Sequence, residues 1–186
     1  MTDDEIALLL EVVQTPERPR DTLEDRVRLV EDRRTIHDLV MAYGWLCDAR
    51  RWDELLDLYT DDFERVLAGT LQEVARGKET LRRLYEAPAL PRAGGAEGGP
   101  PDATQINQYE IRHLIHPPVI RIADDDDHAL AATVYSIVAT AGDGPDLRTG
   151  EHQGGYVFGF RREPVGWRFC SMTVISENAR NPLFQA

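Results

Sequence analysis

The chain has 186 residues, with 21 Lys and Arg against 33 Asp and Glu, which gives a formal charge of −12. This length suffices for one well-packed domain and is too short for two of ordinary size. The strong negative charge makes nucleic acids and anionic membrane surfaces poor partners. The N-terminus carries acids where a signal peptide needs positive charge, and no apolar run approaches roughly 18 residues. We therefore expect one soluble cytoplasmic domain.

The first half of the chain shows helical periodicity with caps and breakers between the segments. Two prolines at positions 16 and 19 end the first segment, so residues 1–20 are expected to be an N-terminal extension. The predicted elements are a helix over 3–13, a long helix from 21–22 to 48–50, a short helix over 52–59, a hairpin of 63–67 with 70–75, and a helix from 77–78 to 85.

The second half alternates apolar and polar residues and predicts strands. They cover residues 109–123, 129–141, 155–162 and 167–176, with a bulge or bend at Pro117-Pro118. Residues 86–103 contain too much Gly and Pro for a core element and predict a mobile loop or lid over the site. Helices followed by strands predict an α+β domain over 21–178, with an antiparallel sheet curled around its helices and a tail at 179–186.

Asp48 lies at the end of the long predicted helix, beside an apolar stripe at helical spacing. The stripe contains Ile36, Leu39, Val40, Tyr43, Leu46 and Cys47. An acid in the last helical turn meets the negative end of the helix dipole, at a cost of about 0.3–1 kcal/mol. Helix stability therefore does not explain this carboxylate. It is either a solvated turn residue or a functional acid at the border of the core.

His113 lies in the strand predicted over 109–115, where alternation places it on the more apolar face with Tyr109, Ile111 and Ile115. A buried imidazole needs a partner for its ring nitrogens. Both patterns point inward, so we expect Asp48 and His113 to lie within hydrogen-bond reach. They then form a proton-transfer pair, or they merely satisfy each other as core residues.

No motif in the sequence indicates a metal or an organic cofactor. The acids at 124–127 before His128 lack the spacing and the Gly of a calcium loop. Gly154-Gly155 precedes no predicted helix and so does not form a phosphate loop. Cys47 and Cys170 lie in separate apolar runs, which is typical of free buried thiols in a reducing compartment.

The segments IHDLVMAYGWLCDARRWDELLDLYTDDF (36–63), GKETL (77–81) and GGYVFGFRREPVGWRF (154–169), together with the inward His113, resemble the SnoaL-like branch of the NTF2-like superfamily. That branch is similar in outline to scytalone dehydratase, ketosteroid isomerase and bile-acid dehydratases. The resemblance implies a cone in which a curved antiparallel sheet wraps about three helices around an apolar pocket. It also implies a homodimer formed through the sheet.

The resemblance also assigns roles to residues. Asp48 and His113 match an Asp–His pair of the dehydratases, Tyr43 matches a tyrosine of the bile-acid dehydratases, and Arg161 matches an arginine on the strand after the Gly-Gly. Tyr43, Tyr59 and Arg161 are the candidate acids or donors, although Tyr43 and Tyr59 could be core residues and Arg161 could face solvent or a dimer partner. The expected substrate-contacting residues are Tyr59, Trp45, Tyr109 and Phe63.

The function expected from these features is that of a cofactor-independent lyase or isomerase, of dehydratase or cyclase type. Its substrate would be a small apolar molecule, either carbonyl-bearing or polycyclic. The alternatives are a ketosteroid-isomerase-like isomerase, a non-catalytic NTF2-like ligand-binding protein, and the small subunit of a ring-hydroxylating dioxygenase. Apolar residues on both faces of the last two strands, with Phe169 opposite Met172 and Val174, favour a homodimer.

Overall fold

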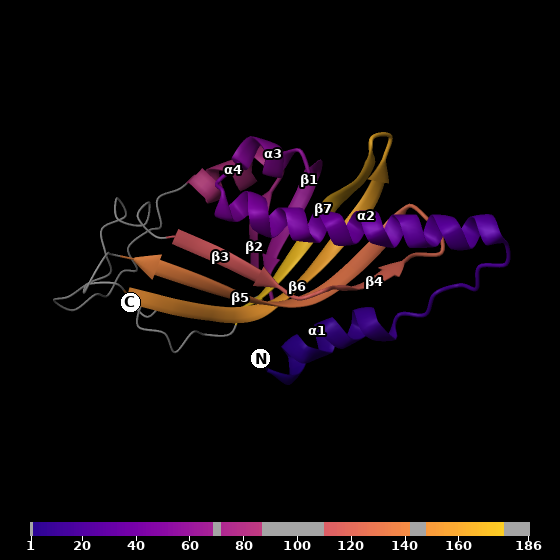
Figure 1. Cartoon of the computed structure of the whole chain (residues 1–186), viewed down its shortest axis with the longest axis horizontal. Coiled ribbons are helices and arrows are strands. Elements are labelled where there is room, and N and C mark those ends of the chain that lie inside the picture. Colours follow the sequence, from indigo (N-terminus) through magenta and orange to yellow (C-terminus); the bar gives the residue numbers. More distant parts are fainter. Residues whose placement is uncertain (1, 69–71, 87–109, 142–147, 177–186) are drawn as a thin grey trace.

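The computed structural model describes residues 2–68, 72–86, 110–141 and 148–176. Within these ranges, α1 to α3 precede the strands, and α4 follows the first two strands (Figure 1). The elements are α1 (Asp3–Gln14), α2 (Leu23–Asp48), α3 (Trp52–Leu56), β1 (Tyr59–Leu67), β2 (Gln72–Arg76), α4 (Lys78–Glu86), β3 (Glu110–Ile115), β4 (Val119–Ile122), β5 (His128–Ala141), β6 (Arg148–Glu163) and β7 (Gly166–Ser176). The predicted α+β class is confirmed.

The strands form one curved, open sheet in the order β2-β1-β7-β6-β5-β3, with β4 also paired to β5. All neighbours are antiparallel except β1 and β7, which run parallel. The predicted curved antiparallel sheet is confirmed, with the parallel β1–β7 pair as an exception. The last strand returns to lie beside the first, so the pairing is set by a contact between distant parts of the chain that local patterns do not encode.

Helix α2 lies along the inner face of the sheet and supplies the centre of the core (Figure 1). Thr22 caps its first turn by accepting a hydrogen bond from the main-chain N–H of Asp25 at 3.0 Å. Ile36, Val40 and Tyr43 recur at helical spacing and are fully or almost fully buried against the strands. The predicted apolar stripe is thus the face that α2 presents to the sheet. No described helix is both long and apolar enough to cross a membrane.

Several predicted boundaries differ from the structure. The short helix ends at Leu56, not at Tyr59, because the Leu58 carbonyl accepts the Phe169 N–H of β7 at 2.9 Å and the chain enters the sheet. The long strand over 109–123 divides at Pro117-Pro118 into β3 and β4, as the two prolines predict. The strand expected from 155 begins at Arg148. The loop at 86–103 and the tail at 179–186 lie outside the described residues, apart from Glu86 at the end of α4.

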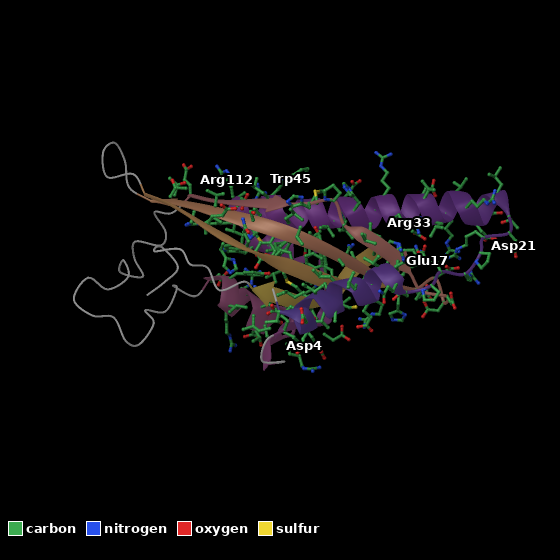
Figure 2. All side chains as sticks on the ribbon, turned by 90° about the horizontal axis from the view of Figure 1, so that it is seen from below. Asp4, Glu17, Asp21, Arg33, Trp45 and Arg112 are labelled. Atoms are coloured by element: carbon green, nitrogen blue, oxygen red, sulfur yellow. The ribbon has the colours of Figure 1, made fainter. Side chains whose placement is uncertain are left out.

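Helix α1 packs on the face of the sheet opposite α2 (Figure 2). Leu9 lies where a side chain on Gly155 would stand, 3.3 Å from the Cβ position. The connection from α1 to α2 is fixed to β4, because Arg121 donates to the carbonyls of Val13 and Thr15 at 2.9 and 3.2 Å. In Figure 2, Glu17 of this connection lies next to Arg33 of α2, with which it forms an ion pair. Residues 2–20 therefore cover part of the outer face of the sheet.

The inner face of β7 is more apolar than strict alternation predicts. The β6–β7 register shifts between Gly159 and Phe160, so that Phe169 pairs with Phe160 while Met172 pairs with Phe158. Because of this bulge, Phe169 and Met172 both point into the core, and both are fully buried. The prediction that Phe169 lies on the opposite face to Met172 is wrong, and that part of the argument for a homodimer disappears with it.

A buried carboxylate ties α2 to the β6–β7 hairpin. Asp32 accepts the indole N–H of Trp167 at 2.9 Å and a guanidinium N–H of Arg162 at 2.6 Å. The Arg162 guanidinium also lies over the Trp167 ring, with Cζ 4.3 Å from the centroid. Both acceptor oxygens are used, and Asp32 is 8% exposed, so this contact fixes the N-terminal half of α2 against the sheet.

We expect Asp32→Ala to lower the free energy of unfolding by about 1–3 kcal/mol, because it leaves the indole N–H of the buried Trp167 without an acceptor. Asp38→Ala is the matched control on the same helix, since the Asp38 side chain is 65% exposed, and it should change stability by less than about 0.5 kcal/mol. Urea unfolding followed by tryptophan fluorescence measures both. Equal effects of the two substitutions would show that Asp32 does not anchor the helix.

Candidate functional site

Asp48 and His113 meet inside the cone. The ring Nδ1 of His113 lies 2.6 Å from Asp48 Oδ1, and the main-chain N–H of His113 donates to both carboxylate oxygens at 3.0 Å. The two side chains are 11% and 10% exposed. The expectation that they lie within hydrogen-bond reach is therefore confirmed by the geometry. The carboxylate binds the ring and the backbone of the same residue.

A close approach of helix and strand makes this contact possible. Gly44 lies one turn before Asp48 and faces β3, where a Cβ at this position would stand 3.3 Å from His113 Cβ and 2.9 Å from Ile115 Cδ1. A larger residue would push the helix outward and lengthen the hydrogen bond between carboxylate and imidazole. The glycine thus sets the distance at which the pair forms.

The ring of Tyr43 stands between the pair and the aromatic core. Its centroid lies 5.9 Å from that of His113, and it also makes edge contacts with Tyr156 and Phe158 at 5.7 and 5.6 Å. Burial raises the pKa of Tyr43 well above its ordinary value. The phenol therefore keeps its proton at neutral pH and can act only as a hydrogen-bond donor or as a weak acid.

Sequence reasoning did not assign three polar side chains near Tyr43 to the site: Arg65, Tyr85 and Tyr156. The Tyr85 hydroxyl lies 3.2 Å from that of Tyr59, and burial raises the pKa of Tyr85 to about 12. Arg65 lies two residues after the fully buried Phe63 on β1. This spacing was the available signal, since residues two apart on a strand share a face.

The structure brings some of the predicted site residues together and separates others. Tyr59 and Phe63 are buried in the core next to each other, with ring centroids 4.4 Å apart. Trp45 is 69% exposed on the outer side of α2 and does not contribute to the interior, so its assignment as a substrate contact is wrong (Figure 2). Trp45 follows Gly44 directly and is therefore rotated by about 100° around the helix axis, so that its side chain points away from the sheet. Tyr109 lies outside the described residues.

Arg161 does not join the pair either. Its guanidinium binds the Asp62 carboxylate through two nitrogens at 2.9 and 3.0 Å and donates to Glu163 at 2.8 Å. It alternates with the fully buried Phe158 and Phe160 and therefore faces outward. The assignment of Arg161 to the catalytic group is wrong, because β6 presents this position to the opposite side of the sheet.

The acidic turn before β5 is closed by its own hydrogen bonds. One oxygen of Asp125 accepts the main-chain N–H groups of Asp127 and His128, at 2.9 and 3.0 Å, and the other lies 2.8 Å from the His128 ring. Nowhere in the described ranges do three or more potential metal ligands gather.

A family model for the SnoaL-like domain matches residues 28–173, which is most of the chain and includes both members of the pair. The chain belongs to the SnoaL-like domain family. Comparison with curated proteins found no match. The family assignment agrees with the open, curved sheet over α2.

Solved structures with this fold include proteins of different kinds from Novosphingobium aromaticivorans. An NTF2-like protein with a cystatin-like fold is 21% identical (TM-score 0.62; 86% of this chain and 93% of that chain). A protein provisionally assigned as a scytalone dehydratase is 18% identical (0.60; 86% and 97%). The beta subunit of a provisionally assigned aromatic-ring-hydroxylating dioxygenase is 24% identical (0.59; 83% and 94%). These likenesses confirm the NTF2-like fold.

The bond to Asp48 predicts the tautomer of His113. A carboxylate only accepts hydrogen bonds, so the neutral ring should carry its proton on Nδ1 and leave Nε2 as the basic nitrogen. Nitrogen-15 NMR of labelled protein should show this tautomer, with His113→Gln used to assign the signal. In Asp48→Asn the preference for Nδ1–H should be lost. A ring with its proton on Nε2 in the unsubstituted protein would contradict the orienting role of Asp48.

Proposed function

We propose that the protein is a cofactor-independent lyase or isomerase of dehydratase or cyclase type, with Asp48 and His113 as its proton-transfer pair. The observation that supports this proposal best is the 2.6 Å contact between the ring Nδ1 and a largely buried carboxylate. In the described part of the chain nothing bonds Nε2 of the same ring. The imidazole is fixed, its Nε2 can accept a proton, and it lies next to the aromatic ring of Tyr43. This arrangement is suited to taking a proton from an apolar substrate.

The chemistry follows from the roles of the two groups. Asp48 holds the tautomer and stabilises the imidazolium that forms when Nε2 accepts a proton from a carbon next to a carbonyl. The electron pair of the C–H bond forms a C=C bond, and the carbonyl electrons move to its oxygen. A leaving group on the next carbon then departs as the carbonyl re-forms, and a proton from the imidazolium or a nearby hydroxyl accompanies it. The substrate class is a small apolar carbonyl-bearing or polycyclic molecule.

The same pair could return the proton to another carbon, which would be a ketosteroid-isomerase-like isomerisation. A non-catalytic ligand-binding protein or a dioxygenase small subunit would instead use the pair only to join α2 to β3. The main-chain N–H bonds to Asp48 already provide that connection at 3.0 Å. A structural role therefore does not need an imidazole at this position, and this favours the enzymatic proposal.

Proton abstraction can be tested without the natural substrate by using 5-nitrobenzisoxazole. A base removes its C3 proton, the electron pair forms a nitrile, and the N–O bond breaks to give a coloured phenolate. We expect His113→Ala and Asp48→Asn each to reduce the protein-dependent rate at least about 10²-fold, because the base or its orientation is lost. Absorbance at saturating protein measures the rate.

His116→Ala provides the matched control, since His116 follows the same strand and is exposed. It should leave the rate unchanged. The fold should persist in His113→Ala, because the main-chain N–H of residue 113 still donates to Asp48, and circular dichroism checks this. Full activity in both pair variants would remove Asp48 and His113 from the proposal. Copurification of an iron-containing large subunit would support the dioxygenase alternative.

We also propose that the protein forms a homodimer through the outer face of the sheet. Leu114 on β3 is 56% exposed and Val134 on β5 is 38% exposed. They lie near each other, because Leu114 pairs with Ser136, two residues from Val134. Exposed apolar side chains on neighbouring strands favour a second copy as partner.

Light scattering at micromolar concentration should give the mass of a dimer. Leu114→Glu should shift the mass toward the monomer, because the carboxylate would have to be buried in the interface. Glu110→Gln on the same strand serves as a control, since its exposed side chain loses only a charge. A monomeric mass for the unsubstituted protein would contradict the proposal.

A further inference from the structure

Arg65 projects into the interior of the cone from β1. It pairs with Met172 of β7, which is fully buried, and it shares its face with Phe63. Its Nε is buried and has no hydrogen-bond partner. The neighbouring Glu64 is turned to the other face, where it pairs with Arg76. Arg65 is thus an inward-facing cation, and the adjacent Glu64 does not neutralise it because Glu64 binds Arg76 on the other face.

Tyrosine hydroxyls and a thiol surround this cation. Its Cζ lies 5.7 Å from the centre of the Tyr85 ring. Burial raises the pKa of Tyr43, Tyr156 and Cys47, and the positive charge of Arg65 opposes each of these shifts. The charge is therefore close enough to act on Tyr43, whose ring centroid lies 5.9 Å from that of His113. Within the described ranges, no carboxylate forms an ion pair with Arg65.

Arg65 differs from two other half-buried arginines of the described chain, each of which binds a carboxylate. Arg162 binds Asp32, and Arg33 binds Glu17. Burying a charge without a counterion is costly, and an apolar residue of similar size would pack more favourably. An arginine cannot lose its proton to escape this cost. Arg65 is half-buried, its Nε is fully buried, and no ion pair to it is present among the described residues. Such a guanidinium, close to the tyrosine that contacts a candidate base, is a feature that a ligand, rather than the fold, would explain.

We propose that Arg65 binds a negatively charged oxygen on a conjugated ring, so that the ligand of this site is a phenolate or an enolate formed from a cyclic ketone. The proposal rests on the proposed function and specifies its substrate class. A planar ring suits this aromatic environment, because the Tyr85 ring next to the cation is itself stacked on Trp52, with centroids 5.2 Å apart. Arg65 would supply the charge, and Tyr43 a hydroxyl donor.

This arrangement matches the charge that develops during proton abstraction. When His113 Nε2 takes the proton from carbon, the negative charge moves to the carbonyl oxygen. Arg65 then stabilises the oxyanion without donating its own proton, because a guanidinium stays ionised. The tyrosines also keep their protons, since their pKa values are raised by burial, and so they donate hydrogen bonds. The proton thus ends on His113, and the negative charge ends on the substrate oxygen next to Arg65. No redox step is involved.

The test uses 4-nitrophenol, whose phenolate absorbs visible light, and 4-nitroanisole, its neutral analogue. We expect the protein to bind the phenolate in preference to the anisole, and to lower the pKa of the bound phenol below its value in water. Arg65→Met should weaken phenolate binding at least about tenfold, which is the scale of a charge-assisted hydrogen bond, and leave anisole binding unchanged. Arg65→Lys should retain most of the preference.

Three controls separate the possible results. Arg83→Met removes the same charge from an exposed position on α4 and should not alter phenolate binding. Thermal unfolding of Arg65→Met should show no loss of stability, because an unpaired buried charge has been removed. A large loss of stability, with both probes weakened equally, would show that Arg65 is structural and would overturn the proposal. Equal affinity of the unsubstituted protein for the two probes would also overturn it.

The failure of this proposal can be told apart from failure of the proposed function. His113→Ala should retain the preference for phenolate, since the base is not part of the oxyanion site, while it loses the reaction with 5-nitrobenzisoxazole. If His113→Ala loses that reaction but the unsubstituted protein binds the two probes equally, the Asp48–His113 base is retained. Arg65 is then removed as its electrostatic partner.

Discussion

One carboxylate at the end of α2 determines how helix and sheet meet. Asp48 occupies a helical turn where the dipole disfavours negative charge, and three N–H contacts from His113 compensate for this. The contact joins residues that are 65 positions apart in the chain, and it requires the close approach that Gly44 allows. At the other end, Asp32 holds the same helix to Trp167. The helix is therefore fixed at two points, which gives the rigidity that His113 would need as the proposed base.

Local patterns predict this part of the structure well. The apolar stripe of α2 and the alternation in β3 are both properties of neighbouring residues, and together they place Asp48 and His113 toward one interior. The two prolines likewise predict the break between β3 and β4. The predictions fail where a contact with a residue far away in the sequence determines the position of a side chain or a strand. Arg161 is bound by Asp62, and the parallel pairing of β1 with β7 moves Tyr59 from the predicted helix into the sheet.

Arg65 shows a second limit of sequence reasoning. In isolation, an arginine on a strand is most simply interpreted as a solvated residue, because most arginines are exposed. Only the burial of Phe63 and the pairing of Arg65 with the fully buried Met172 show that it faces inward. That no carboxylate of the described residues forms an ion pair with Arg65 is a property of the folded molecule, so it becomes visible only when β1, β7 and α4 are placed together. The family resemblance directs attention to Arg161, on another strand.

The position of β7 in the sheet has a consequence for synthesis of the chain. This strand lies between β1 and β6, and the Phe169 N–H reaches back to the Leu58 carbonyl. During synthesis on the ribosome, β1 emerges well before β7. Tyr59 and Phe63 of β1 therefore stay without their contacts to β7 until the rest of the sheet has been synthesised. A nascent chain halted before β7 would already contain Asp48 and His113. It would expose aromatic surface to chaperones and would lack the strand that closes the site.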